Sequence, residues 1–467
     1  MAYYTHIING KPVTSPTTLD VINPATRKEI AELDEAVAAA RAAFPAWSTK
    51  SQEERAEVML QMASILEKNV QEYKQILTSE QGKPLADAEW ELGRAISWLR
   101  ETANFRLPER VILDDDQTRI TELHVPIGVC AGIPPWNFPM MICMWKLCPA
   151  LLAGNTMIIK PSPFTPLTIL RFVKDIQVVT PPGVVNALNG DDGLGPMITS
   201  HPGINKVGFT GSTETGKKVM AGASAGLKRL TLELGGNDPA IILPDVNVAK
   251  VVPDVFWAAF FNNGQICGAA KRIYVHEKIY DQFRDEFVKF AKTIKMGDGT
   301  DPESQLGPVQ NFTQYKRVLS HFEDAKANGY KFAIGGDIDP NPAGGLFVPV
   351  SIVDNPPDNS KIVQEEPFGP IVPLLKWSDE ADVIRRANDS HFALSASVWG
   401  KDLTVVERIA KQIEAGNISM NEFYVPTPLA SVSGHKESGI SVEGGLHGLL
   451  SYTNLQTFTL KKNPAFV

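Results

Sequence analysis

The sequence predicts an α/β protein with two doubly wound sheets, and two observations carry that prediction. Short apolar segments rich in Val, Ile and Leu alternate with helical patterns over residues 128–236. The same alternation resumes after Pro239. It is typical of βαβ units, whose parallel strands are buried on both faces. Two such blocks predict two domains with a cleft between them, where α/β proteins commonly bind ligands.

Helices are expected before the first block. At residues 34–47, acidic residues precede an alanine-rich apolar pattern, which is typical of a helix start. Two more helical patterns cover residues 51–75 and 86–105. Residues 118–125 alternate polar and apolar side chains, and this period predicts a strand with one exposed face.

The two blocks supply the buried strands, each a short β-rich run between glycine or proline turns. The strands of the first block are expected at residues 128–133, 156–160, 183–188, 206–211 and 230–236. The strands of the second block include residues 240–243, 272–277 and 395–400.

The composition is that of an ordinary globular protein, because 43% of the 467 residues are hydrophobic and 21% are charged. At roughly 100–200 residues per domain, this length suggests two to four structural units. The formal charge of −8 disfavours nucleic-acid partners and anionic membranes. The first residues carry no signal-peptide pattern, and no apolar stretch reaches the roughly 20 residues of a membrane span. We therefore expect a soluble, cytoplasmic protein.

The four cysteines are too few to staple a chain of this length: Cys130, Cys143, Cys148 and Cys267. None belongs to a CxxC pair, so the spacing disfavours zinc and we expect no metal site. Free thiols are typical of a reducing compartment.

Residues 211–218 read GSTETGKK and nearly match a phosphate-binding loop. Position 218 is Lys instead of the Ser or Thr that would bind Mg²⁺, which disfavours an NTPase. The pattern still predicts a strand, a glycine and hydroxyl turn, and then a helix whose N-terminal N–H groups favour a phosphate. An ordinary strand-to-helix turn is the alternative, and no GxGxxG motif is present.

Cys267 is a candidate nucleophile. Gly264 and Gly268 flank it in the segment GQICG. A free cysteine is more often a small buried hydrophobe than a nucleophile. The glycines favour the second interpretation, because they let a substrate approach both the thiol and the backbone N–H.

Glu233 and Asn137 are candidates for the same chemistry. Glu233 ends an apolar strand before two glycines, where burial would raise its pKa and make it a plausible base. Asn137 lies between two aromatic rings and two prolines in PWNFP, and a rigid amide there can donate to a developing oxyanion. Taken alone, each residue fits a structural role as a paired carboxylate or as a turn asparagine.

Seven motifs in a fixed order decide between these interpretations. They are PWNFP (135–139), KPS (160–162), FTGST (209–213), LELGG (232–236), GQIC (264–267), EEPFGP (365–370) and GHKESG (434–439). Together they resemble the aldehyde dehydrogenase superfamily, of the NAD(P)-dependent hydrolytic type. The resemblance extends over nearly the whole chain, from ING and NPAT (8–10 and 23–26) to LxxYT (449–453).

The resemblance implies a reaction and the residues that perform it. The family oxidises an aldehyde to a carboxylic acid through a thioester, with hydride transfer to a nicotinamide and hydrolysis by water. Cys267 matches the nucleophile, and Glu233 matches the general base that activates Cys267 or the deacylating water. Asn137, with the backbone N–H of Cys267, matches the oxyanion hole, and Lys146 matches a lysine with a proton-relay role. Such covalent catalysis splits one hard step into two easier ones.

The resemblance also implies the binding residues for NAD or NADP. The matching positions are Trp136, Lys160, Ser162, Gly211, Ser212, Gly235, Glu366 and Phe368. Lys160 matches the lysine at the adenosine ribose, and Ser212 matches the hydroxyl at the pyrophosphate. Glu366 and Phe368 match the residues at the nicotinamide ribose and ring.

For the substrate, the matching positions are Phe138, Met141, Trp145, Phe261 and Asn421, with Ile142 and Phe423 as neighbours. No arginine stands among them to hold a second carboxylate. We therefore expect an apolar aliphatic or aromatic aldehyde.

The family architecture implies the domain limits. A cofactor-binding domain would comprise residues 1–112 and 126–235, and a catalytic domain residues 236–430. Residues 113–125 and 431–467 would form an oligomerisation element and C-terminal segment. Strands expected at 118–125 and 449–460 would otherwise leave an unpaired edge, so we expect a homodimer or homotetramer.

The sequence departs from the family pattern at two places. The segment between Lys28 and Asp34 is several residues shorter than usual. The substrate-pocket wall reads PLASVSGHK instead of PFGGxK.

Cofactor choice depends on a further position. Many NAD-preferring members carry a glutamate three residues after the ribose lysine, where it repels a 2′-phosphate, but this chain has Pro163. Lys160 and Ser162 could donate to a phosphate, whereas Asp191 and Asp192 in the adenine-side turn could favour NAD. Because losing one repulsive carboxylate relaxes specificity before it reverses it, we expect use of both cofactors with modest discrimination.

Two alternatives stay open on the sequence. One is a thiol esterase or a non-catalytic binding member of the same fold, and the more distant one is a phosphate-binding NTPase. A CoA-acylating variant is disfavoured by the retained Glu233, which can activate water.

Overall fold

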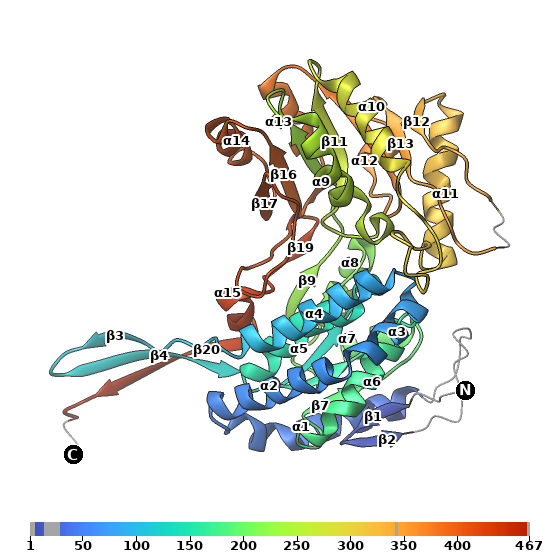
Figure 1. The fold of residues 1–467 in the computed structure, drawn as a ribbon. Helices are drawn as coiled ribbons and strands as arrows, with labels where there is room; N and C mark the ends of the chain where they lie inside the picture. The colour runs from blue at the N-terminus through green and yellow to red at the C-terminus, as the bar shows by residue number, and fades with distance from the viewer. Residues whose placement is uncertain (1–4, 14–28, 341–343, 465–467) are drawn as a thin grey trace.

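The computed structural model describes residues 5–13, 29–340 and 344–464. Figure 1 shows two lobes and an arm that projects from the lower lobe. Each lobe has one mostly parallel sheet with helices on both faces, so the predicted doubly wound α/β class is confirmed. The NPAT motif (23–26) and Lys28 lie outside the described residues.

The lower lobe contains an eight-stranded sheet with the order β19-β9-β8-β5-β6-β7-β1-β2. Its five central strands are parallel, and the strands at both edges are antiparallel. The strands are β1 (His6–Ile8), β2 (Lys11–Val13), β5 (Val129–Ile133), β6 (Thr156–Ile159), β7 (Val185–Ala187), β8 (Lys206–Thr210), β9 (Arg229–Glu233) and β19 (Gly439–Ile440). The five strands expected in the first block are therefore all present.

Helices cover both faces of this sheet. One face packs against α1 (Glu29–Ser48), α7 (Leu194–Ser200) and α8 (Thr213–Ser224). The other face packs against α5 (Pro139–Leu152) and α6 (Leu167–Asp175), which the short 3-10 turn η1 (Ile176–Val178) follows. Outside α5 lie α2 (Gln52–Lys68), α3 (Val70–Gln81) and α4 (Leu85–Thr102).

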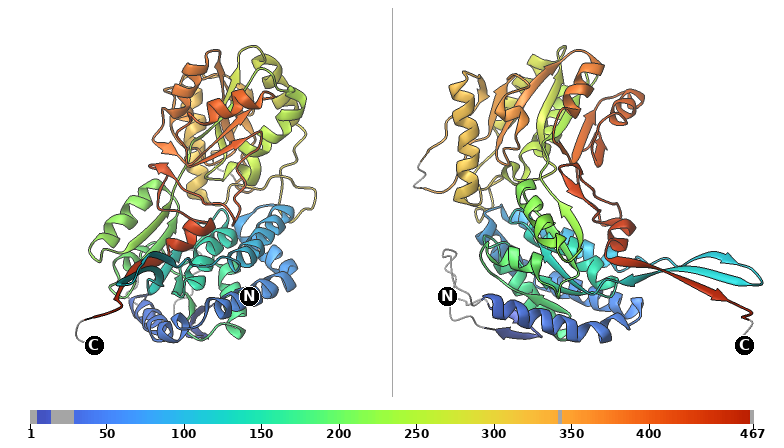
Figure 2. Two further views of the ribbon diagram at one scale, coloured as in Figure 1. Left: turned by 90° about the vertical axis from the view of Figure 1, so that its left-hand side faces the viewer. Right: turned by 180° about the vertical axis from the view of Figure 1, so that it is seen from behind.

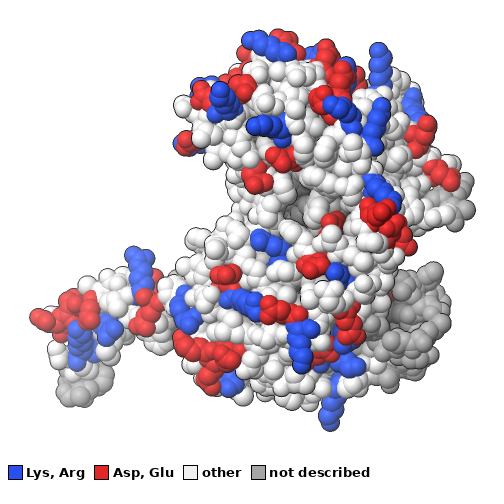
Figure 3. Space-filling view, viewed as in Figure 1, with Lys and Arg blue, Asp and Glu red and all other residues white. Residues whose placement is uncertain are grey.

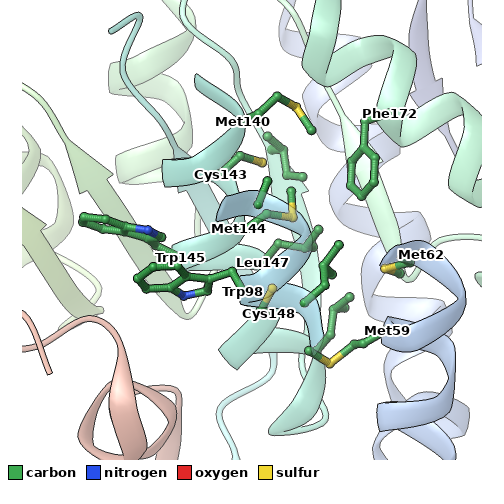
Figure 4. Packing of buried hydrophobic residues seen from close by; sticks show 14 of the residues in the cluster. Met59, Met62, Trp98, Met140, Cys143, Met144, Trp145, Leu147, Cys148 and Phe172 are labelled. Carbon is green, nitrogen blue, oxygen red and sulfur yellow. The ribbon is translucent and has the colours of Figure 1, made fainter. Parts of the chain in front are cut away.

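Helix α5 is buried along its whole length, which explains its apolar sequence. Figure 4 shows Met144 and Leu147 of α5 in the layer that also holds Met59 and Met62 of α2. On another side of α5, Trp145 stacks on Trp98 of α4 with ring centroids 5.2 Å apart. This packing fixes the helix that begins just after the PWN segment.

The upper lobe contains a seven-stranded sheet with the order β12-β13-β14-β11-β10-β16-β17, parallel except for β12. Its strands are β10 (Asp238–Ile242), β11 (Ala270–His276), β12 (Phe332–Ile334), β13 (Ser351–Asp354), β14 (Ile371–Trp377), β16 (Ser395–Trp399) and β17 (Asn417–Met420). One face packs against α9 (Val248–Phe260) and α10 (Tyr280–Ala291). The other packs against α11 (Phe312–Ala327), α12 (Lys361–Gln364), α13 (Glu380–Asn388) and α14 (Leu403–Ala410).

The arm is a three-stranded antiparallel sheet of β3 (Arg110–Asp114), β4 (Thr118–Pro126) and β20 (Thr453–Lys461). It extends away from both lobes (Figure 2). The expected strand at 118–125 is present, whereas β3 was not predicted. Apolar side chains on β3 and β20 are exposed, among them Ile112, Leu455 and Phe458.

Two predicted elements were wrong in their limits. The helix expected over residues 51–75 is two helices, because the Asn69 amide donates to the Ile65 carbonyl (2.9 Å) where α2 ends. The strand expected at 449–460 starts at Thr453, because Leu449 belongs to α15 (Gly445–Leu450) and is buried against the lower lobe.

The C-terminal segment joins all three parts of the molecule. Strand β18 (His435–Lys436) pairs with β15 (Phe392–Ala393) of the upper lobe, β19 belongs to the lower sheet, and β20 belongs to the arm. The domain limit expected at residue 112 falls inside β3.

The face in Figure 3 carries interspersed positive and negative side chains without a large patch of either sign. Within the described part of the chain, no helix combines the length and the apolar composition that crossing a membrane requires.

Candidate active site

The lower sheet places its motif residues at the carboxyl ends of adjacent strands. From β5 the chain continues to β6 on one side, and β8 later adds on the other side. This reversal is a topological switch point, where open α/β sheets bind ligands. Trp136 follows β5, Gly211 and Ser212 follow β8, and Gly235 follows β9. The fold therefore gathers residues that are up to a hundred positions apart in the sequence.

The upper sheet contributes the amino ends of its strands to the same place. Cys267 lies just before β11, and Glu366 and Phe368 lie just before β14. Trp136 and Phe368 come into edge-to-face contact across the two lobes, with ring centroids 5.4 Å apart. The candidate site is thus built where the two sheets meet.

The segment before Cys267 has an unusual backbone. Asn262, Asn263 and Gly264 have φ angles of 50°, 59° and 72°. A Cβ atom at Gly264 would lie 2.4 Å from the carbonyl oxygen of Gly369. Only glycine permits this close approach, which explains why the GQIC motif begins with glycine.

Cys267 borders two cavities, so this residue lies where they meet. Burial raises the pKa of Cys267 to about 12, and the Lys271 cation opposes that rise. The ammonium of Lys271 donates to the Cys267 carbonyl (2.6 Å) and forms an ion pair with Glu366 (3.1 Å). Lys271 was missed in the sequence, where it lies four residues beyond the candidate nucleophile.

Asn137 is fixed beside the cysteine segment. Its side-chain Nδ2 donates to the carbonyl of Gln265 (2.9 Å), and its own carbonyl accepts from Lys83 (2.8 Å). Asn137 also borders the second of the two cavities together with Cys267. The amide thus bonds a neighbouring segment instead of its own backbone.

Glu233 belongs to a buried charged cluster. Burial raises the pKa of Glu233 well above its usual value, Glu443 raises it further, and Lys146 lowers it. The Lys146 ammonium lies 2.8 Å from Glu443 Oε1 and donates to the Thr210 hydroxyl at 2.7 Å. Glu233 borders neither cavity, and its Oε1 has no hydrogen-bond partner within the described ranges. Glu443, in the sequence ISVEGG just after GHKESG, was missed.

The second and smaller cavity contains most of the expected cofactor positions. Trp136, Gly211, Ser212, Gly235, Glu366 and Phe368 border it, whereas Lys160 and Ser162 do not. Gln314 and Arg317 also border it and were not predicted. Gln314 donates to the carbonyls of Pro367 and Phe368, and Arg317 donates to that of Glu366. Their signal was weak, being two polar residues one turn apart on an ordinary helix.

The residues of this cavity fit a dinucleotide. A Cβ atom at Gly235 would lie 2.5 Å from Glu366 Oε2, so the bare glycine leaves the carboxylate in place. Ser212 is the N-cap of α8, and the free N–H groups of that helix start face the turn after β8. The predicted strand, turn and helix are therefore present.

The larger cavity has a volume of about 310 Å³ and mainly apolar walls, to which seven aromatic residues contribute. Phe138, Met141, Trp145 and Phe261 border it as expected, with their neighbours Ile142 and Phe423. The aromatic residues Trp90, Trp257 and Tyr424 border it as well and were missed, because they lie outside the motifs.

The structure does not bring Asn421 to this cavity. Its exposed side chain donates to the carbonyl of Gly400 and accepts from the Gly400 N–H, both at 2.8 Å. Asn421 therefore clamps the ends of β16 and β17, with a φ of 55° that asparagine tolerates.

Within the described ranges, no group of three or more His, Cys, Asp or Glu residues could hold a metal ion. All four cysteines are free thiols, and Cys130, Cys143 and Cys148 are buried in the lower lobe.

Comparisons with known proteins agree with this architecture. The model of the aldehyde dehydrogenase family matches residues 8–458. A putative aldehyde dehydrogenase, FUS7, from Gibberella fujikuroi is 38% identical over 98% of this chain and 99% of its own length.

Two crystal structures show the same fold. An NADP-dependent enzyme of E. coli has a TM-score of 0.94 and 33% identity, with 98% of each chain covered. Betaine aldehyde dehydrogenase of Staphylococcus aureus, in complex with NAD+, has a TM-score of 0.93 and 30% identity, covering 99% of this chain and 95% of that one.

The chain belongs to the aldehyde dehydrogenase family. It is an NAD(P)-dependent oxidoreductase, and covalent catalysis through a cysteine is general for this family.

Proposed function

We propose that Cys267 is the nucleophile that attacks the aldehyde, and one observation carries this assignment. The residue borders both the larger, mainly apolar cavity and the cavity at the carboxyl ends of β5, β8 and β9. Cys130, Cys143 and Cys148 border neither cavity. Only Cys267 can therefore meet an aldehyde on one side and a cofactor on the other.

The Cys267 thiol releases its proton to water, and its Sγ forms a bond with the carbonyl carbon. The oxygen becomes an oxyanion, which the Asn137 amide and the Cys267 N–H stabilise. The carbon then loses a hydride, for which bound NAD(P)+ supplies the acceptor. Water hydrolyses the resulting thioester, so that the acid leaves and Cys267 is free again.

Glu233 is proposed to take the proton of that water. Its raised pKa places it closer to neutrality than an ordinary carboxyl group, which suits a general base. Lys146 connects Glu443 to Thr210, and Thr210 borders the cofactor cavity. We propose that this buried chain stabilises the charge of Glu233 and passes its proton outward.

The cofactor is proposed to lie against Trp136, Gly211, Ser212 and Gly235, with its nicotinamide end at Glu366 and Phe368. Lys160 and Ser162 would serve the adenosine ribose, farther from the thiol. Neither NAD nor NADP is excluded by the cavity residues, and Arg317 is an added cation at its wall.

The substrate is proposed to be a predominantly apolar aliphatic or aromatic aldehyde. Phe138 and Phe261 stack with ring centroids 6.2 Å apart, and Trp90 meets Phe261 edge to face at 5.3 Å. Within the described residues, no Lys or Arg borders the cavity, so no group there would hold a second carboxylate.

Mass spectrometry of the Glu233→Gln variant tests the chemistry directly. Mixed with an aldehyde and excess cofactor, this variant should accumulate an acyl group on Cys267, because deacylation is slowed. A peptide map would locate the added mass. An unmodified Cys267 in an enzyme that still reduces cofactor would contradict the proposal.

The arm suggests a homodimer or homotetramer. Its exposed apolar side chains and the free edges of a thin three-stranded sheet would be covered by a second chain. We propose a cofactor-binding lower lobe, a catalytic upper lobe and this arm as the oligomerisation element. We also propose a cytoplasmic location, because four free thiols suit a reducing compartment. A monomeric mass by light scattering at micromolar concentration would contradict the oligomer.

A further inference from the structure

The wall of the larger cavity carries one carboxylate, that of Asp87. Asp87 lies in the first turn of α4 and is half-buried. Its Oδ2 atom is buried and has no hydrogen-bond partner in the described structure. An unpaired buried carboxylate oxygen is costly, so it calls for a partner from outside the protein.

The position in the helix explains only part of this arrangement. The first turn of a helix favours an acidic residue, because its free N–H groups carry partial positive charge. That effect does not require the residue to border a cavity. Ala86 and Val425 are exposed, so this end of the cavity opens to solvent and a ligand can reach Asp87.

The surroundings of Asp87 favour a positive charge. Trp90, one turn along α4, and Trp257 border the same cavity, and aromatic faces attract cations. Burial raises the pKa of Asp87 to about 7, and a cation placed beside it would restore the charged form.

The protein's own cations near this end of the cavity do not pair with Asp87. Lys83, the cation that acts on Asp87, is fully buried and paired with Glu91 (2.7 Å). Arg94 donates to the carbonyl of Pro426 and lies over the Trp90 ring. Neither one forms a salt bridge with Asp87 in the described part of the chain.

We propose that Asp87, with Trp90 and Trp257 of the same cavity, forms a subsite for a cationic group. Among aldehydes whose carbon chain is otherwise apolar, the enzyme would favour those with an ammonium group at the end remote from the carbonyl. This inference rests on the proposed role of Cys267, which would receive the aldehyde at the other end of the cavity. The apolar walls would hold the carbon chain between the two ends.

A pair of isosteric aldehydes tests the subsite. In 4-(trimethylammonio)butanal a charged nitrogen replaces the quaternary carbon of 5,5-dimethylhexanal, and the shape is otherwise the same. We expect kcat/KM to favour the cation by at least tenfold in the wild-type enzyme. In Asp87→Asn the preference should fall to near unity, while Asp87→Glu should retain part of it.

Glu89→Gln is the matched control, because Glu89 lies on the same helix but is half-exposed and paired with Lys74 (2.7 Å). This variant should keep the wild-type preference. Equal preference in the wild type and Asp87→Asn would overturn the proposal. A second outcome would also overturn the proposal. In it, the wild type prefers 6-hydroxyhexanal to heptanal, Asp87→Asn loses this preference, and neither enzyme prefers the cationic aldehyde. The subsite would then bind a neutral hydrogen-bond donor instead of an ammonium group.

A binding measurement separates this inference from the proposed function. Calorimetric titration with butyltrimethylammonium, which has no aldehyde, should show at least tenfold weaker binding to Asp87→Asn than to wild type. Oxidation of both aldehydes at equal rates would defeat only the subsite. Failure to oxidise either aldehyde, with butyltrimethylammonium still bound, would defeat the role of Cys267 and leave the subsite standing.

Discussion

The two cavities that meet at Cys267 are built in different ways. The cofactor cavity is made mainly of turns that follow or precede strands, and its residues are glycines and polar groups beside fixed backbone. The substrate cavity is lined mainly by apolar and aromatic side chains from α4, α5 and α9 and from the segments 261–269 and 423–426. The first therefore follows from sheet topology and short motifs. The second depends on which large side chains happen to face one another.

This difference separates what is common to the family from what distinguishes one member. Backbone turns must bind the same dinucleotide, so residues such as Gly211 and Gly235 are constrained by close approach. The aromatic wall has only to fit an aldehyde, and many combinations of rings fill a similar volume. Changes at the thiol should therefore abolish the chemistry, whereas changes elsewhere should alter it by degrees.

The sharpest test removes the thiol of Cys267, the cysteine that borders both cavities. Cys267→Ala should lower aldehyde oxidation by at least about 10⁴-fold, because no other thiol borders the cavities. Cofactor binding should be nearly unchanged, since the wall of that cavity stays intact. Absorbance measures cofactor reduction and so checks the loss of activity. Calorimetry measures cofactor affinity and so checks that binding is retained. Retained turnover would show that the shared thiol is not the nucleophile.

Glu233→Gln should separate activity from stability. Activity should fall by about 10²–10⁴-fold, the usual contribution of a general base. Burial raises the pKa of Glu233 well above 4.5, so the folded state holds a proton that the unfolded state releases as pH rises. The unfolded state then binds fewer protons, and wild-type stability falls with increasing pH in this range.

Glutamine does not titrate, so the stability of the variant relative to the wild type should increase as pH rises. We expect the variant to be more stable at pH 8 by about 1 kcal/mol, and the difference to shrink toward pH 5. Calorimetric Tm values at the two pH values provide the measurement. A Tm difference that does not change with pH would mean that Glu233 is not buried in its neutral form.

Gly264→Ala tests the backbone that positions the thiol. A Cβ there would meet the Gly369 carbonyl at 2.4 Å with a φ of +72°, so we expect a loss of about 3 kcal/mol in stability. Turnover should fall at least tenfold because Cys267 is displaced. Gly93→Ala is the control, since a Cβ at this helical glycine meets nothing within 4 Å and should add up to about 1 kcal/mol. Denaturant unfolding of both variants checks the contrast, which would vanish if Gly264 were simply a flexible position.

The same contrast explains what could be predicted from the sequence. The parallel strands of the lower sheet were readable, because buried β-rich runs between turns have a distinct pattern. In the upper sheet β10, β11 and β16 were expected, whereas β13, β14 and β17 were not. Residues inside a motif, such as Trp136 and Phe368, line the cofactor cavity as expected. Asn421 was chosen because it matches a substrate position of the family, yet its amide bonds Gly400 and does not border the substrate cavity. A pattern of letters gives a residue's place on a strand but not the direction of its side chain.

Residues that act across long separations were not readable. Glu443 meets Lys146 although 297 positions separate them, and no local period indicates such a pair. Asp87 lies near the start of the helix expected over residues 86–105, and only the fold shows that it borders a cavity. Strand β3 of the arm was not predicted either, because all five of its residues are exposed and its sequence lacks the polar and apolar alternation that indicated β4.

Cofactor choice should show the smallest effect, because it depends on the far end of the cofactor cavity, away from the thiol. Pro163 has no carboxylate to repel a 2′-phosphate, and the neighbouring Ser162 hydroxyl accepts from the Phe164 N–H (3.3 Å). Asp191 is engaged in its own turn, where its Oδ1 accepts from the Gly193 N–H (2.7 Å). Neither side of the expected adenosine site therefore imposes a strong choice.

We expect kcat/KM for NAD and NADP to differ by less than about a thousandfold, equivalent to roughly 4 kcal/mol. Pro163→Glu should shift the ratio toward NAD by about tenfold, because a carboxylate near Lys160 both binds ribose hydroxyls and repels a phosphate. Pro163→Gln, which has nearly the same shape without the charge, should shift it much less. Steady-state kinetics with both cofactors measure the ratio for each variant. An equal shift in both variants would show that the loss of proline, and not the charge, causes the effect. A wild-type ratio of kcat/KM values above a thousandfold would mean that a group other than residue 163 selects the cofactor.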